Sequence, residues 1–175
     1  KASSSDFNKV LTQESQMFEK WSELIEKLKT TNPNLNIIFT VSPVRHSKDG
    51  LINNNRSKAR LIELAHDLTQ FNNASYFPSY EILVDELRDY RFYKKDRVHP
   101  TSEATDYVWQ KFSDYLFEAS TSELNKHIAQ IKLGLSHESI HPGSDEDRER
   151  VKNLMQRKYK LENNHPEVCW DQKRG

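Results

Sequence analysis

A short apolar run, Ile37-Ile38-Phe39-Thr40-Val41, is the feature that most constrains the fold. It is rich in β-branched and aromatic residues, has no charge, and follows an amphipathic helix that we predict over about Leu11–Lys29. Pro33 helps to end that helix, and Pro43 ends the run. A continuous apolar run of this length after a helix is typical of a parallel strand that is buried on both faces.

Further along the chain, helical and strand-like patterns continue to alternate. We predict a helix over about Ser57–Phe71, a strand over Ala74–Pro78, a short helix from Ser79, a loop over Arg88–Pro100 and a long helix from Thr101. Such alternation predicts βαβ units and an open parallel sheet. Beyond Glu118 the chain predicts two weakly apolar helices, at Glu123–Leu135 and Ser144–Leu161, and a polar tail.

Two predictions about organisation follow. Residues 1–120 would form the α/β part of one domain, and residues 121–175 a helical, polar extension of the same domain. Two strands are too few for a free-standing parallel sheet, so we expect the rest of the sheet to lie N-terminal to Lys1. The stretch Lys1–Asp6 agrees with this, since it has neither an initiator Met nor the features of a signal peptide.

Charge and composition exclude several classes of function. The chain has 26 Lys and Arg and 26 Asp and Glu, and this zero net charge is not that of a nucleic-acid-binding domain. No apolar run approaches the roughly 18 residues of a membrane span. Cys169 is the single cysteine of the sequence, so no internal disulfide calls for an oxidising compartment. A soluble protein, with a cytoplasmic location favoured, fits these features.

The candidate catalytic motif is Asp96-Arg97-Val98-His99-Pro100, which we place in a loop between the second strand and a long helix. Ligands of open α/β sheets bind outside the carboxyl ends of the strands. An Asp three residues before a His in a turn can accept a hydrogen bond from the His Nδ1 and leave Nε2 to act as a base. By itself the motif is weak evidence for catalysis, because a surface Asp near a His that caps a helix has the same sequence pattern.

Four other motifs precede this one in a fixed order. They are Thr40-Val-Ser-Pro-Val-Arg45-His46, Asn54-Asn-Arg-Ser-Lys58-Ala, Tyr76-Phe-Pro-Ser-Tyr-Glu81 and Asp85-Glu-Leu-Arg-Asp-Tyr-Arg-Phe-Tyr93. Together the five motifs closely resemble the C-terminal half of the GSCFA domain, a branch related to the SGNH or GDSL-type esterases and lipases. The resemblance runs from about Leu35 to Phe112, with a looser likeness on either side.

The resemblance implies a three-layer, flavodoxin-like α/β fold, present here as a C-terminal fragment with additional helices. It also implies that Asp96 and His99 are the late Asp and His of a Ser-His-Asp triad in an ester hydrolase. The block Gly-Ser-Cys-Phe-Ala, which would hold the nucleophile, does not occur in the sequence, nor does an Asn-containing oxyanion block. We therefore expect the chain alone to be inactive. The alternative is a non-catalytic binding module that keeps the fold.

Other residues of the chain carry open interpretations. Arg45 would either hold a substrate carboxylate or phosphate, or pair with Asp85 or Asp89, and His46 would be a substrate contact or an ordinary loop histidine. Ser42 lacks the glycine-flanked sharp turn of a nucleophile. The aromatics of the Arg88–Tyr93 run would either pack the catalytic loop against the sheet, with Arg88 and Asp89 paired, or contact substrate.

The implied chemistry calls for no cofactor or metal ion, because acyl transfer by a triad uses neither. His137 and His141 have the spacing of two ligands on one helix, but Pro142 and Gly143 argue for a loop instead. The expected partner is a small-molecule, saccharide or lipid ester. Self-association through an uncovered sheet edge is a further possibility.

Overall fold

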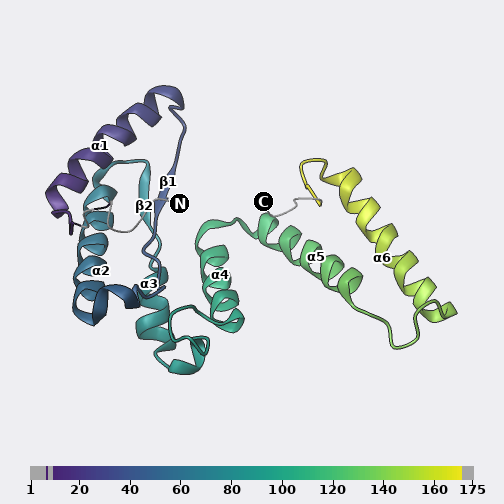
Figure 1. Cartoon of the computed structure of the whole chain (residues 1–175). Coiled ribbons are helices and arrows are strands. Elements are labelled where there is room, and N and C mark those ends of the chain that lie inside the picture. Colours follow the sequence, from purple (N-terminus) through teal and green to yellow (C-terminus); the bar gives the residue numbers. More distant parts are fainter. Residues whose placement is uncertain (1–6, 8–9, 171–175) are drawn as a thin grey trace. The chain divides into compact units, whose positions relative to one another are not determined.

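The computed structural model describes Phe7 and residues 10–170, and the chain divides into two compact units, Lys1–Phe112 and Ser113–Gly175. Figure 1 shows the course of the chain, and each unit is described by itself. The stretch Lys1–Asp6, which contributed to the prediction of a missing N-terminal part, lies outside the described residues.

The first unit alternates helices with two very short strands. Its elements are α1 (Glu14–Thr31), β1 (Ile37–Phe39), the 3₁₀ turn η2 (Ser47–Asp49), α2 (Gly50–Asp67), the 3₁₀ turn η3 (Leu68–Gln70), β2 (Ala74–Tyr76), α3 (Ser79–Glu81), the π-helical segment η4 (Ile82–Leu87), the 3₁₀ turn η5 (Tyr90–Phe92) and α4 (Ser102–Leu116), whose last residues belong to the second unit. The predicted order of helices and strands is confirmed, with boundaries shifted by a few residues.

The largest boundary error concerns α2. The helix was predicted to begin at about Ser57, but the chain is helical from Gly50 onward. Gly50 has a φ of 76°, a left-handed conformation that suits glycine at the sharp start of this helix. In the first turns of this helix, Asn54 Oδ1 accepts a hydrogen bond from the His46 backbone N–H at 2.8 Å.

The sheet has only two strands among the described residues. β1 and β2 pair in parallel, with Ile37 opposite Ala74 and Phe39 opposite Tyr76. The prediction of a three-layer flavodoxin-like fold is therefore wrong: the described chain is mostly helical, and its strands span three residues each. The run Ile37–Val41 pairs only as far as Phe39, whose carbonyl accepts from the Phe77 N–H at 2.8 Å. β1 is also half-buried, whereas a central parallel strand would be fully buried.

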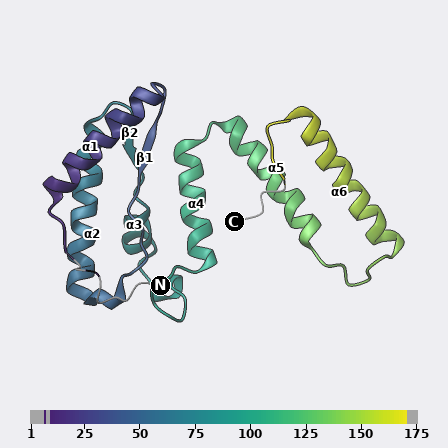
Figure 2. The same ribbon diagram turned by 45° about the horizontal axis from the view of Figure 1, so that its top comes forward.

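Two small hydrophobic cores hold the first unit together. In one, Ile25 of α1 packs with Leu64 of α2 and Leu68, and Phe39 of the sheet lies against this cluster. Both views show α1 and α2 side by side next to the strands (Figures 1 and 2). In the other core, Leu83, Phe92, Tyr93 and Ala104 pack together, which joins η4 and η5 to the start of α4.

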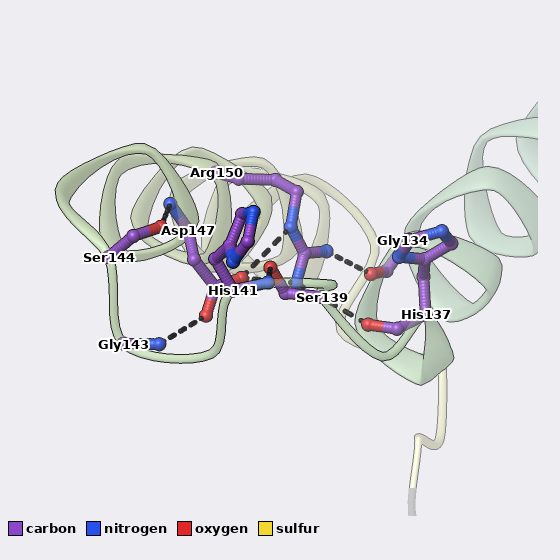
Figure 3. Close-up of polar contacts among 8 residues, drawn as sticks. All are labelled: Gly134, His137, Ser139, His141, Gly143, Ser144, Asp147 and Arg150. Atoms are coloured by element: carbon purple, nitrogen blue, oxygen red, sulfur yellow. Dashed lines mark hydrogen bonds and ion pairs between the residues drawn. The ribbon is translucent and has the colours of Figure 1, made fainter.

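The second unit is a helical hairpin of α5 (Ala119–Ser136) and α6 (Asp145–Asn164). Figure 3 shows how its connecting loop is held. Arg150 donates to the carbonyl of Gly134 at 2.6 Å and to Asp147 Oδ1 at 2.9 Å. The Gly143 backbone N–H donates to Asp147 Oδ2 at 3.0 Å, and this bond, followed by the one from Arg150, lowers the pKa of the Asp147 carboxyl. These contacts connect the end of α5 to the first turns of α6.

Among the helices of the described residues, none combines the length and the apolar character that crossing a membrane requires.

Candidate active site

The Asp96–His99 motif lies in a loop that is closed at its base by backbone hydrogen bonds. Tyr93 and Pro100 form an antiparallel bridge, and the Lys94 N–H donates to the His99 carbonyl at 2.8 Å. Phe92 and Tyr93, just before the loop, are buried in the second core. Phe92 and Tyr93 therefore anchor the loop, but they pack against η4 and the start of α4 and not, as predicted, against the sheet. Tyr90 is 64% exposed.

Within this loop, Asp96 and His99 are hydrogen-bonded to each other. Asp96 Oδ2 lies 2.7 Å from His99 Nδ1, the contact that the D-x-x-H spacing predicts. The second carboxylate oxygen, Oδ1, accepts from the backbone N–H groups of Val98 at 2.8 Å and His99 at 3.0 Å. An Asp that accepts from the N–H two residues ahead is a common turn former, which explains why the chain turns here.

The turn forces Arg97 into the left-handed region, with a φ of 56°. This conformation is unfavourable for a residue with a Cβ atom, so it needs compensation. The two N–H groups that donate to Asp96 and the Arg97 N–H, which donates to the Lys94 carbonyl at 2.8 Å, provide that compensation. The backbone thus fixes the carboxylate on one side while His99 fixes it on the other.

These contacts lower the pKa of Asp96 well below its ordinary value. The hydrogen bond from the His99 side chain is the largest cause, followed by those from the Val98 and His99 backbone. Asp96 is therefore a carboxylate at neutral pH. The side chains of His99 and Asp96 are 57% and 47% exposed, so the pair is accessible to a partner group. The geometry provides an oriented imidazole with its Nε2 edge away from the carboxylate.

Arg45 lies against the same loop. Its backbone N–H donates to the Val98 carbonyl at 3.3 Å, and its guanidinium Nη1 donates to the Arg97 carbonyl at 3.4 Å. The guanidinium also stacks over the rings of Tyr93, at 4.2 Å from the centroid, and Tyr90, at 5.3 Å. Within the described part of the chain Arg45 has no ion pair with Asp85 or Asp89, and Asp89 instead accepts from the Arg91 N–H.

The two remaining candidates after β1 are His46 and Ser42. The backbone N–H of His46 is bound to Asn54, and its exposed ring hydrogen-bonds to none of the described residues. Ser42 Oγ accepts from the Val44 N–H at 3.2 Å, a local turn contact, and its carbonyl accepts from Lys58 Nζ. The structure therefore brings Arg45 to the Asp96–His99 loop by direct contact, while His46 and Ser42 have contacts elsewhere.

Ser79 connects the ends of the two strands. Its hydroxyl donates to the Val41 carbonyl at 2.9 Å, and its oxygen lies 2.6 Å from Thr40 Oγ1. Because the single Ser79 hydrogen is used on Val41, Thr40 is the donor of the second bond. This pair fixes the point at which the chain leaves β1 toward Arg45. The sequence alone predicted only that a short helix begins at Ser79.

Sequence reasoning also missed Lys58 as a site residue. Its side chain is only 4% exposed, and burial lowers the pKa of its ammonium group. A signal was present, because Lys58 precedes Leu61, Ala65 and Leu68 at helical spacing and so falls on the predicted apolar stripe of that helix. A charged residue on such a stripe is unusual unless it has a specific partner.

No cluster of three or more potential metal-ligating His, Cys, Asp or Glu side chains occurs within the described residues. His137 is the C-cap residue of α5, and His141 lies in the loop before α6. The two therefore do not share a continuous helix. Cys169 is an exposed free thiol.

Comparison with known proteins gives one match. Residues 1–112, more than half of the chain, match the GSCFA family. The search of curated proteins and the search of solved structures each found no match. The matched segment contains all five ordered motifs and the loop that joins Asp96 to His99. The chain belongs to the GSCFA family.

Proposed function

We propose that Asp96 and His99 are the Asp–His pair of a serine-type ester hydrolase related to the SGNH enzymes, and that this chain is the C-terminal part of its catalytic domain. The observation that carries the proposal is the 2.7 Å contact between Asp96 Oδ2 and His99 Nδ1. The ordered motifs resemble the GSCFA domain, and the relation of that domain to the SGNH esterases supplies the reaction class. The serine nucleophile would come from outside the 175 residues, which contain no Gly-Ser-Cys-Phe-Ala block.

In this reaction His99 Nε2 takes the proton of the serine hydroxyl while the serine oxygen attacks the ester carbonyl. The imidazolium then donates that proton to the departing alcohol, which leaves an acyl-serine. Water attacks the acyl-serine in the second half, and His99 again takes a proton and returns it to the serine oxygen. Asp96 stays ionised throughout, because its pKa is far below neutral. It keeps the His99 ring in one tautomer and stabilises the positive charge.

The test uses the protein in which this chain follows a Gly-Ser-Cys-Phe-Ala block. We expect hydrolysis of p-nitrophenyl acetate, and we expect Asp96→Asn and His99→Ala each to lower kcat by about 10³-fold or more. The matched control is His127→Ala, since His127 also contacts a carboxylate, Glu123, at 3.3 Å on an exposed surface. An equal loss of kcat in the His127→Ala control, or full activity of both Asp96→Asn and His99→Ala, would show that Asp96 and His99 are not catalytic.

The 175-residue chain itself should show no turnover of short-chain esters. A triad without its nucleophile retains only the effects of binding and oxyanion donors. Ser42 is the internal alternative that this experiment examines. Turnover by the isolated chain that Ser42→Ala abolishes would show that the nucleophile lies within it. A full-length protein that binds an ester but never cleaves it would favour the non-catalytic binding module.

We also propose that Arg45 contacts the substrate, because its guanidinium lies against the Asp96–His99 loop and has no carboxylate partner within the described chain. A similar role for His46 stays a prediction, and no contact of its ring favours it. The expected substrate is a saccharide or lipid ester. Arg45→Lys keeps the charge but loses the planar stacking group, so it should raise KM more than it lowers kcat.

A further inference from the structure

A small polar cavity adjoins the Asp96–His99 loop on the Arg45 side. It has a volume of about 130 Å³ and lies between the start of α2, α3 and the end of the aromatic run. This is room for a few water molecules or for one small charged group. The polar side chains that line it are Arg45, Asn54, Asn55, Lys58, Tyr80 and Tyr93.

Lys58 is the buried cation of this cavity. Its ammonium donates to the Ser42 carbonyl and lies 5.9 Å from the centroid of the Tyr80 ring. An ammonium group has three N–H donors, and this carbonyl satisfies one of them. Burying a charge without an opposite charge is costly, so a cation at 4% exposure calls for an anionic partner.

The described part of the chain supplies no such partner. Within the described residues neither Lys58 nor Arg45 has a carboxylate at ion-pair distance, and the contacts of both go to carbonyls and aromatic rings. Asp85 lies near enough to help raise the pKa of Tyr80, but it does not line the cavity. Glu81 is hydrogen-bonded to Tyr76 at 2.8 Å.

Neutral donors surround the two cations. Burial is the largest cause of a raised pKa at Tyr80, so its hydroxyl keeps its proton at neutral pH. Asn54 Nδ2 donates to Asn55 Oδ1 at 3.4 Å, and this contact leaves the Nδ2 hydrogens of Asn55 for another acceptor. The cavity therefore combines two positive charges with hydroxyl and amide donors, a lining that matches an oxyanion.

We propose that this cavity is a binding site for a small oxyanion group, a carboxylate or a phosphate, held by Lys58 and Arg45. Lys58 acts as the buried point charge, and Arg45 approaches from the rim next to the Asp96–His99 loop. Tyr80 and Asn55 donate to the remaining oxygens. The site stands on its own geometry and does not depend on hydrolysis at Asp96 and His99.

The experiment is a titration of the 175-residue chain with inorganic phosphate, and separately with acetate, at constant ionic strength. Binding is followed through the side-chain amide signals of Asn54 and Asn55 by NMR, with acetamide as the uncharged control ligand. We expect saturable shifts with at least one anion and none with acetamide. Saturation by phosphate alone or by acetate alone identifies which oxyanion the site takes.

The decisive variant is Lys58→Met, which keeps a long unbranched side chain and removes the ammonium group with its charge. It should weaken anion binding about tenfold or more, since a hydrogen bond to a charged group is among the stronger ones. Lys48→Met is the matched control, because Lys48 is exposed in the neighbouring turn η2 and should change affinity less than twofold.

If Lys58→Met does not fold, Tyr80→Phe replaces it, since it removes one hydroxyl only and should weaken binding severalfold. Three results would overturn the proposal. The first is that neither anion gives saturable shifts. The second is that the Lys58→Met or Tyr80→Phe variant binds the anion as tightly as the wild type. The third is that Lys48→Met weakens binding as much as Lys58→Met, which would indicate a general charge effect.

Discussion

Replacing Ser79 by alanine removes both hydrogen bonds that connect the strand ends. Ser79 is 8% exposed, and its hydroxyl is the donor to the Val41 carbonyl. Without it a buried carbonyl loses its donor, at a cost of about 1–3 kcal/mol. Thr40 loses its acceptor too, but Thr40 is exposed and can turn its hydroxyl to water, which adds little. We therefore expect Ser79→Ala to lower the free energy of unfolding by about 1–3 kcal/mol.

Two further variants separate the hydrogen bonds. Thr40→Val removes only the outer bond and should cost less than about 1 kcal/mol. Ser75→Ala is the control on β2, where the serine side chain makes no hydrogen bond to a described residue, and should be close to neutral. The assay is urea unfolding followed by intrinsic fluorescence. If Thr40→Val proves as costly as Ser79→Ala, or if Ser75→Ala equals both, the Val41 carbonyl is not the group that matters.

Three other predictions follow from the structure. Ile25→Ala removes a side chain with 0% exposure, so it should lower the free energy of unfolding by about 2–5 kcal/mol. The control is Leu24→Ala, at a residue that is 42% exposed. A smaller loss for Ile25→Ala than for Leu24→Ala would contradict the placement of Ile25 in the core. Arg150→Leu removes the donor to the Gly134 carbonyl and should speed amide exchange at the end of α5, and unchanged exchange would show that the loop does not need it. Because folding lowers the pKa of Asp96, its contribution to stability is present above the unfolded value of about 3.9 and is lost as pH falls below it. The stability difference between wild type and Asp96→Asn, measured by urea unfolding, should therefore shrink as pH falls below about 4, and a constant difference would mean that ionisation of Asp96 is not involved.

The order of helices and strands was predictable because it depends on local patterns. The stripe that includes Ile25 predicted α1, and the run from Ile37 predicted β1. The size of the sheet was not predictable in the same way, since it depends on how many strands find partners. The fold expected from the resemblance has a full parallel sheet. The described residues contain only the short β1–β2 pair.

In the candidate site, too, local contacts were predictable from the sequence and long-range contacts were not. The Asp96–His99 contact was predictable because three residues of one turn determine it. The burial of Lys58 was not, because it depends on Ser42 and Tyr80, which lie 16 and 22 positions away in the sequence and come close only in the folded chain. The same applies to Arg45, whose stacking on Tyr93 replaces the ion pair that charge alone suggested.

The most direct test of the proposed catalytic pair is the tautomer of His99, measured by long-range ¹H–¹⁵N NMR of the chain at alkaline pH. With Nδ1 hydrogen-bonded to Asp96, we expect the proton to reside on Nδ1 and Nε2 to be unprotonated, as a base that accepts a serine proton requires. Asp96→Asn should remove this preference. A His99 ring with its proton on Nε2, or a tautomer ratio that Asp96→Asn leaves unchanged, would contradict the assignment of Asp96 and His99 as a catalytic pair.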